Sequence, residues 1–223
     1  TKTSHKMLLK LTTILFLISS LSSSSIDCQP QYQSYEYPPH LSQTLECVFT
    51  ADSSTSTYDC ISLNATIRDR GQVFYTFDGN HIQNHTNADV NGIKIASQVC
   101  HYFPANLGKL LPLLKKLEIS NSGLVDVDAQ ELFQMQNLQV LNLRGNRIEI
   151  LNFGLLKFNR ELTSIDFSDN FITIVATDLF HSLDKLKFAD FNNNFCVKNE
   201  HAKENLRDWE RELRKNCNAG FHR

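Results

Sequence analysis

The sequence has no concentration of positive charge. Its 22 lysine and arginine residues are balanced by 24 aspartate and glutamate residues, which gives a formal net charge of −2 at pH 7. A nucleic-acid-binding domain needs a strongly basic stripe or face. We therefore expect no nucleic-acid partner.

Common catalytic and metal-binding motifs are also missing. The chain contains no G-x-S-x-G elbow, no P-loop and no H-E-x-x-H sequence. His81 and His85 stand four residues apart, but they lie in an asparagine-rich loop without an acidic third ligand. The sequence therefore predicts a protein that is not an enzyme and that needs no cofactor or metal.

Only one apolar run suggests a targeting segment, and it lies near the N-terminus. Residues 11–18 are mostly apolar, follow three lysines and precede the serine-rich stretch 19–25. This order is typical of a signal peptide, and the run is shorter than the roughly 20 residues that span a bilayer. We expect residues 1–25 to be a signal peptide, with residues 1–6 ahead of Met7 a candidate untranslated leader. An uncleaved signal anchor is the alternative. No second apolar run of spanning length follows, so the expected location is extracellular.

An apolar pattern recurs five times at a spacing of 24 residues. Each copy has apolar residues three, five and ten positions after its start, and the starts are Val90, Leu114, Leu138, Leu162 and Leu186. The clearest copies run from Leu138 to Ile148 and from Leu162 to Ile172, with the form L-x-x-L-x-L-x-x-N-x-L that is typical of leucine-rich repeats. Alternate residues of a short strand face the core before the chain turns at the asparagine. Residues 90–195 are therefore predicted to form an α/β leucine-rich-repeat solenoid, a short arc with a parallel β-sheet on its concave face.

Six cysteines follow the predicted signal peptide, which suggests disulfides in an extracellular chain. Their positions favour one bridge on each side of the repeats, Cys47–Cys60 and Cys196–Cys217. Closing the second loop should stabilise the fold by roughly 3 kcal/mol. Cys100 falls at an inward repeat position, so it is either a buried thiol or the partner of Cys28, and the sequence leaves both open.

The segments that flank the repeats are predicted to cap the ends of the solenoid, where an exposed apolar edge must be covered. Residues 26–46 are polar, contain three prolines and are expected to form a flexible leader. Residues 47–89 are expected to form a β-hairpin cap from strands at 58–63 and 72–77. Residues 196–223 are expected to form a helical cap, with a membrane-surface or partner helix as the alternative. Its apolar residues recur at helical spacing: Ala202, Leu206, Trp209 and Leu213.

With both caps included, residues 47–217 resemble secreted extracellular leucine-rich-repeat proteins, most closely those of insects. The segments that carry this resemblance are Cys47…Tyr58-Asp-Cys60, Asp78-Gly-Asn-His81, Asn87-Ala-Asp-Val90, Phe103-Pro104, Ser122-Gly-Leu124, Asp166-Phe-Ser-Asp-Asn170 and Asn194-Phe-Cys196. The resemblance implies a concave, ligand-binding sheet that serves recognition or adhesion. Such C-terminal caps often carry four cysteines with a Cys-x-Cys pair, whereas this chain has only Cys196 and Cys217, which implies a simpler cap. We expect no membrane-spanning or signalling segment after Cys217.

The outward strand positions are the candidate binding surface, because function can vary there without disturbing the core. The middle column is Lys94, Glu118, Asn142, Asp166 and Asp190; its neighbours are Ala96, Ser120, Arg144, Ser168 and Asn192, and Gly92, Lys116, Val140, Ser164 and Phe188. Arginine and aromatic residues are enriched at interface hot spots. The candidate ligand-binding residues are Glu118, Val140, Asn142, Arg144, Asp166, Phe188 and Asp190.

Three further sets of residues have structural or modification roles in this interpretation. Asn146, Asn170 and Asn194 are expected to pair backbone groups inside the turns. Phe133, Phe158 and Phe180 are expected to form a packed column behind the sheet. Asn64 and Asn84 begin glycan-acceptor sequons.

The predicted function is binding of an extracellular protein or glycan, without a membrane span. A solvated face that binds nothing would have a similar sequence. A structural or self-assembling role and inhibition of a secreted enzyme are further alternatives, and the oligomeric state is left open.

Overall fold

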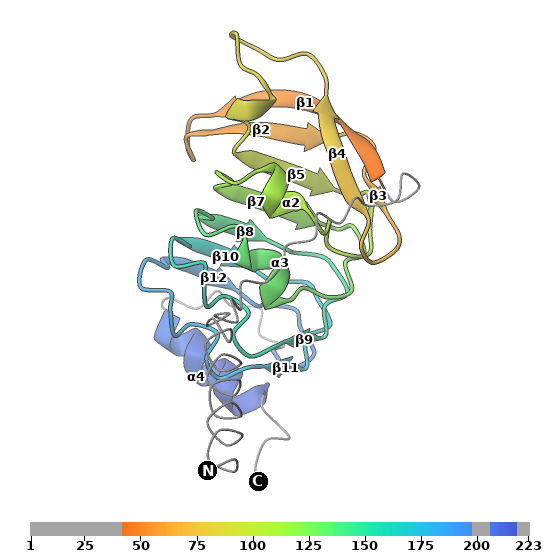
Figure 1. The fold of residues 1–223 in the computed structure, drawn as a ribbon. Helices are drawn as coiled ribbons and strands as arrows, with labels where there is room; N and C mark the ends of the chain where they lie inside the picture. Colours follow the sequence, from red (N-terminus) through yellow and green to blue (C-terminus); the bar gives the residue numbers. More distant parts are fainter. Residues whose placement is uncertain (1–41, 198–205, 218–223) are drawn as a thin grey trace, which may run out of the picture. The chain divides into compact units, whose positions relative to one another are not determined.

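The computed structural model describes residues 42–197 and 206–217, which belong to one compact unit of the chain. Its largest element is an eight-stranded sheet in the order β12-β10-β8-β7-β5-β2-β1-β4. Five parallel strands come from the repeats (Figure 1): β5 (Gly92–Ala96), β7 (Lys116–Ser120), β8 (Val140–Asn142), β10 (Ser164–Asp166) and β12 (Phe188–Asp190).

The rest of each coil is short and mostly irregular. The small elements are η2 (Asn87–Asp89), α2 (Leu107–Leu110), α3 (Ala129–Phe133) and two pairs of two-residue strands. These pairs are β3 (Thr66–Ile67) with β6 (Val99–Cys100), and β9 (Ile150–Leu151) with β11 (Ile174–Val175). No helix among the described residues is long and apolar enough to cross a membrane.

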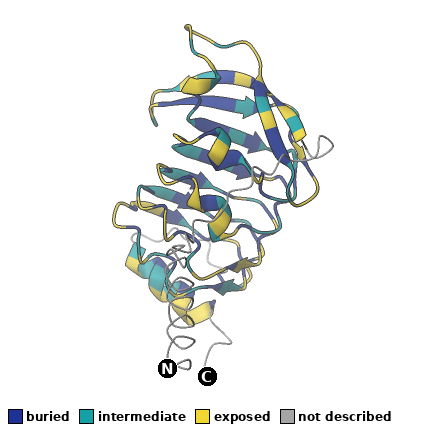
Figure 2. Cartoon of the chain, viewed as in Figure 1, coloured by how far each residue is buried: buried dark blue, intermediate teal, exposed yellow. Residues whose placement is uncertain are grey.

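The register of the sheet stacks equivalent residues of successive repeats. Leu117 pairs with Leu141, Leu141 with Ile165 and Ile165 with Ala189, and all four are at least 93% buried. Figure 2 shows the resulting alternation in β8, β10 and β12, where a buried residue lies between two more accessible ones. The 24-residue period therefore produces one continuous apolar core.

A ladder of asparagine side chains joins the coils at their turns. The amide oxygen of Asn170 accepts a hydrogen bond from the Ile148 backbone N–H (3.1 Å), and its Nδ2 donates to the carbonyl of Leu143 (2.9 Å), both in the preceding coil. The same Nδ2 donates to the Phe167 carbonyl of its own coil. Asn146 and Asn194 repeat this arrangement. This is a leucine-rich-repeat solenoid, so the predicted fold is confirmed.

Toward the N-terminal cap, other residue types replace the asparagines of the ladder. Ser122 takes the asparagine position in the second repeat, and its hydroxyl lies 3.4 Å from the Ile95 carbonyl. Gln98 takes it in the first and bonds the backbone of Ser62 and Ala65. A further buried amide was not predicted: Asn159 donates to the carbonyls of Leu132 and Met135 at the back of the coils.

The N-terminal cap differs from its prediction in which strands pair. β2 (Thr57–Ser62) pairs antiparallel with β1 (Ser42–Asp52), and β4 (Val73–Asp78) pairs parallel with the other edge of β1. The predicted hairpin between 58–63 and 72–77 is therefore wrong. Residues 42–46, assigned to the flexible leader, are the start of a strand, in which buried Leu45, Cys47 and Phe49 alternate with exposed Glu46 and Val48.

The C-terminal cap is a helix, α4 (Leu206–Asn216), as predicted for its described part. Trp209 and Leu213 are buried, and the Trp209 ring lies 5.4 Å from that of Phe191 in the last coil. Ala202 lies outside the described residues. The Cys196–Cys217 bridge and a hydrogen bond from the Val175 N–H to the Cys217 carbonyl attach this cap to the repeats.

The phenylalanine column behind the sheet is only partly as predicted. Phe133 and Phe158 pack edge to face (4.9 Å between ring centres), yet 42% and 40% of their surfaces remain exposed. Phe180 packs instead against Phe191, at 5.9 Å. Repeat position alone did not show that the back of the coils is open at Phe133 and Phe158.

We predict that Asn170→Ala lowers the free energy of unfolding by about 1–3 kcal/mol, because buried backbone groups in two coils lose their partner. Urea denaturation would measure this change. Asn152→Ala, at an exposed position, is the control and should change stability by less than about 0.5 kcal/mol. Equal stabilities of the two variants would contradict a structural role for the ladder.

Candidate functional site

The outward columns predicted from the sequence are present in the sheet. Strand pairing aligns Lys94 with Glu118, Glu118 with Asn142, Asn142 with Asp166 and Asp166 with Asp190. The neighbouring column runs from Gly92 to Phe188 in the same register. We call the face formed by these outward residues the concave face.

The N-terminal cap extends this face by two strands. Ile61 of β2 aligns with Lys94, and Val48 of β1 aligns with Ile61, so both continue the middle column. Half of the Val48 surface is exposed. This extension was not predicted from the sequence, because the cap was expected to form a separate hairpin.

The lysines and carboxylates in the N-terminal half of the concave face form ion pairs with one another. The ammonium group of Lys116 lies 2.6 Å from a carboxylate oxygen of Asp52 and 2.9 Å from one of Asp59. The hydrogen bond from Lys116 to Asp52, with others from Ser54 and Thr55, holds the pKa of Asp52 well below its ordinary value.

Gly92 makes room for this ion pair. It aligns with both Asp59 and Lys116, and a Cβ atom added to it would lie 1.8 Å from Oδ1 of Asp59. The missing side chain thus allows the Asp59 carboxylate to lie over the strand and meet the lysine from the next repeat.

Glu118, a candidate binding residue, belongs to this ion-paired half. Its carboxylate forms an ion pair with Lys94 (3.0 Å) and accepts a hydrogen bond from the Ser120 hydroxyl (2.8 Å). With 15% of its side chain exposed, it offers little free surface.

The middle-column residues of the C-terminal half are organised differently. One side-chain oxygen of each accepts a hydrogen bond from the backbone N–H two residues ahead: Asn142 from Arg144 (3.0 Å), Asp166 from Ser168 (2.9 Å) and Asp190 from Asn192 (2.9 Å). These bonds fix the side chains at the ends of their strands. No lysine or arginine among the described residues pairs with Asp166 or Asp190.

Asp190 is short of compensating charge. Its pKa is raised above the ordinary value, first because it is partly buried and further because Asp166 and Asp169 lie near it. The Asn192 N–H and the positive charge of Arg144 act in the opposite direction without cancelling the shift.

Arg144 is a candidate residue that the structure places in an ion pair. Its guanidinium lies 2.8 Å from Asp169, which also accepts a hydrogen bond from Asn193 Nδ2 (2.7 Å). These residues border an open hollow of about 410 Å³ at the rim of the concave face, lined by Arg144, Ser168, Asp169, Asp190, Asn192 and Asn193.

Asp169 and Asn193 were not among the candidate site residues. Both have a positive φ, as do the equivalent residues of the other repeats: Ser97, Asn121 and Gly145. Asparagine, aspartate and glycine adopt this left-handed conformation most readily. These residue types recur one position before the ladder residues, and this recurrence could have identified Asp169 and Asn193 from the sequence.

Val140 and Phe188 lie on the outer side of the middle column. Phe188 is 51% exposed, whereas Val140 is partly covered. Phe188 and Asp190 are two residues apart and therefore point to the same side of β12. The structure brings Asn142, Asp166, Asp190 and Phe188 to one half of the face and leaves Glu118 in the other.

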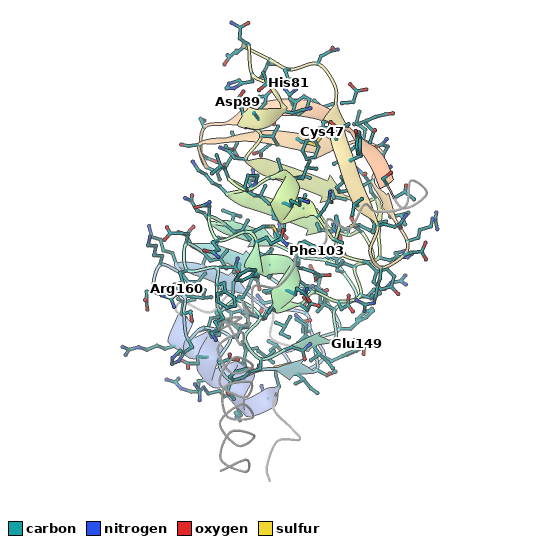
Figure 3. All side chains as sticks on the ribbon, viewed as in Figure 1. Cys47, His81, Asp89, Phe103, Glu149 and Arg160 are labelled. Carbon is teal, nitrogen blue, oxygen red and sulfur yellow. A yellow bond between two sulfur atoms is a disulfide. The ribbon has the colours of Figure 1, made fainter. Side chains whose placement is uncertain are left out.

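The histidine pair lies in the cap and takes part in an aromatic cluster. His81, labelled in Figure 3, stacks on Phe49 at 3.9 Å, and its Nδ1 lies 3.0 Å from the Tyr58 hydroxyl. His85 stacks on the other side of the cluster, 4.2 Å from the Tyr58 ring. Among the described residues, no group of three or more histidine, cysteine or acidic side chains is arranged to hold a metal ion.

The cysteines form the two bridges predicted from their positions, Cys47–Cys60 and Cys196–Cys217. Cys100 is a buried free thiol, and Cys28 lies outside the described residues. Burial, followed by the charge of Glu131, raises the pKa of Cys100 to about 12. This thiol is therefore protonated at neutral pH and packs in the core.

The two sequons differ in their surroundings. Asn84 is exposed in the loop between β4 and η2. The Asn64 side chain instead accepts a hydrogen bond from the Glu46 N–H (2.9 Å) and reaches the Thr44 carbonyl (3.5 Å) along β1. Asn84 is thus the more accessible of the two acceptors.

A second hollow, of about 280 Å³, lies away from the concave face. It is bordered by Arg70, Tyr102, Phe103 (Figure 3) and Glu131, among others. Arg70 pairs with Asp126 and lies over the Tyr102 ring. Burial, together with the nearby charges of Asp128 and Asp126, raises the pKa of Glu131 to about 7, although a hydrogen bond from the Asp128 N–H acts in the opposite direction.

Comparison with known proteins gives structural similarity alone. No protein-family model matches the chain, and no curated protein does. One similar solved structure is a TLR13–ssRNA13 complex, with 20% identity over 68% of this chain and 20% of that chain, at a TM-score of 0.49. Another is the leucine-rich-repeat ectodomain of the receptor kinase SOBIR1 from Arabidopsis thaliana, with 16% identity over 68% of this chain and 80% of that chain, at a TM-score of 0.42. The chain therefore spans about a fifth of the first of these proteins.

We predict that Gly92→Ala destabilises the protein by about 1–3 kcal/mol, because the added methyl group displaces the Asp59 carboxylate. Combining it with Asp59→Ala should remove most of this penalty. A double-mutant cycle measured by thermal unfolding would test the coupling, and strict additivity of the two substitutions would contradict it.

We also predict that stability falls as the pH rises from about 4.5 to about 7. The folded-state pKa of Glu131 lies above its ordinary value of 4.5, so the native state binds its proton more tightly than the unfolded state does. Glu131→Gln should weaken this dependence and gain about 1–2 kcal/mol at pH 8, allowing for partial exposure. Chemical denaturation across this pH range would measure it, with exposed Glu149→Gln as the control. If Glu131→Gln kept the wild-type slope of unfolding free energy against pH, another titrating group would be responsible for the dependence.

Proposed function

We propose that the chain is a secreted, non-catalytic recognition protein that binds an extracellular protein or a glycan through its concave face. The observation that carries this proposal is the asymmetry of that face. In its N-terminal half, Lys94 and Lys116 form ion pairs with the neighbouring carboxylates. Its C-terminal half presents exposed Phe188 beside Asp166 and Asp190, which have no cationic partner among the described residues.

Catalysis is not needed to explain these carboxylates. The Asp190 carboxylate faces an open hollow, and both side chains use one oxygen to fix the strand end. General acid–base chemistry is most effective where the protein holds substrate and catalytic groups together and excludes water. A fixed but exposed arrangement suits a binding surface better.

Secretion is supported by independent features. The N-terminal segment has the composition of a signal peptide, and disulfides persist mainly in oxidising compartments. In this proposal, residues 1–25 are removed, the repeats of residues 90–195 bear the binding surface, and residues 47–89 and 196–223 act as caps. Glycans would be attached at Asn84 more readily than at Asn64.

We predict that Phe188→Ala combined with Asp190→Asn reduces capture of a partner from extracellular fluid by about tenfold, with a nearly unchanged melting temperature. Removal of an exposed aromatic anchor and a charge should affect contact more than folding. Tagged mature chain, affinity capture and quantitative mass spectrometry would measure it.

Phe153→Ala is the matched control, because Phe153 is 78% exposed and lies outside the sheet. It should leave capture unchanged. A partner that is retained by the double variant but lost in Phe153→Ala would place the binding surface on the back of the coils.

A further inference from the structure

We propose that the C-terminal half of the concave face binds an extended segment of a partner protein that presents arginine or lysine side chains. This inference rests on the proposed function and names the chemistry of the ligand. The segment would cross β8, β10 and β12, with its cationic group beside Asp166 and Asp190 and its apolar atoms on Phe188.

The first argument is the distribution of charge. The cationic side chains at outward strand positions are Lys94, Lys116 and Arg144, and each is already within 3.0 Å of a carboxylate of this chain. Asp166 and Asp190 are left without such a partner in the described part of the chain. The charge that remains for a ligand is therefore negative, and interfaces favour a partner of complementary charge.

The second argument is an excess of hydrogen-bond acceptors at the hollow. The side-chain oxygen of Asn192 is buried and has no hydrogen-bond partner among the described residues. The hydrogen bond that Asp190 accepts from the Asn192 N–H uses its Oδ1 oxygen, which leaves the second oxygen available. A guanidinium group carries five N–H donors and no acceptor, so it matches this set of groups.

The third argument is the position of the apolar anchor. Phe188 projects from the same side of β12 as Asp190, and Val140 lies two strands away in the same column as Phe188. Two strand spacings are roughly 10 Å, which an extended chain spans in about three residues. An arginine or lysine in such a segment can place its aliphatic stem on Phe188 while its charged group reaches the carboxylates.

The raised pKa of Asp190 is consistent with this arrangement. Its ionised form lies beside Asp166 and Asp169, and the positive charge that compensates it comes from Arg144, which forms an ion pair with Asp169. A bound cation would supply the missing positive charge.

The test uses three synthetic peptides: hexa-arginine, hexalysine and hexaglutamate. Each would be titrated into the isotopically labelled mature chain at low ionic strength, with affinity and side-chain amide shifts followed by NMR. We expect the two basic peptides to bind and to shift the Asn142, Asn192 and Asn193 amide resonances. Hexaglutamate should cause no such shifts.

Two isosteric double variants distinguish binding at a local site from general electrostatic attraction of a basic peptide to a negatively charged protein. Asp166→Asn with Asp190→Asn preserves the acceptors for Ser168 and Asn192 and should lower the affinity for hexa-arginine by about tenfold or more. The control, Asp184→Asn with Glu149→Gln, removes two exposed carboxylates outside the sheet and should change the affinity by less than about twofold.

Equal losses in the two double variants, no basic-peptide binding, or preferred binding of hexaglutamate would overturn this inference. The proposed function would survive that result if the partner captured from extracellular fluid still depended on Phe188. Loss of that dependence would overturn the proposed function itself.

Discussion

The structure depends on the pairing of backbone groups where each coil turns. A coil that bends away from its strand leaves N–H and C=O groups in the interior, where they cannot meet water. The amides of Asn146, Asn170 and Asn194 pair these groups in their own coil and in the preceding one. Because each bond links residues in adjacent coils, the ladder also fixes the register between repeats. The apolar spine and the outward columns follow from that register.

The same register determines which charges meet. Lys94 reaches Glu118 in the adjacent strand, and Lys116 reaches Asp59 across Gly92. Toward the C-terminus the middle column continues with Asn142, Asp166 and Asp190, and no lysine or arginine of the described residues pairs with the two aspartates. Substitution at one repeat position therefore changes the face from ion-paired carboxylates to carboxylates without a cationic partner in the described part of the chain, without altering the core beneath it.

The repeats could be predicted from the sequence, whereas the N-terminal cap could be predicted only in part. Leu141 and Ile165 belong to a pattern that recurs in phase five times, so each copy supports the others. β1 and β4 occur once, and their pairing joins residues such as Gln43 and Phe74 that are distant in the chain. Nothing in a local pattern distinguishes that pairing from a hairpin of neighbouring strands. The alternation of Leu45, Cys47 and Phe49 could have revealed β1, but not its neighbours in the sheet.

The candidate site was predictable to a similar degree, for a related reason. Strand alternation identified Asp166, Asp190 and Phe188 as outward residues, and the register brought them together. Strand alternation could not show that Glu118 forms an ion pair with Lys94, or Arg144 with Asp169. Ion pairs depend on side-chain conformations, which repeat position does not determine.

The rim of the concave face shows how a structural requirement can also supply binding chemistry. The residue before each ladder position must adopt a positive φ, which favours glycine, asparagine and aspartate. Gly145 meets this requirement without a side chain, whereas Asp169 and Asn193 meet it and also place a carboxylate and an amide beside the hollow. Backbone conformation thus restricts the rim to a few residue types, and the choice among them decides whether a repeat contributes polar groups. The carboxylate of Asp169 holds Arg144 in place, so this choice also leaves Asp190 without a cation of its own.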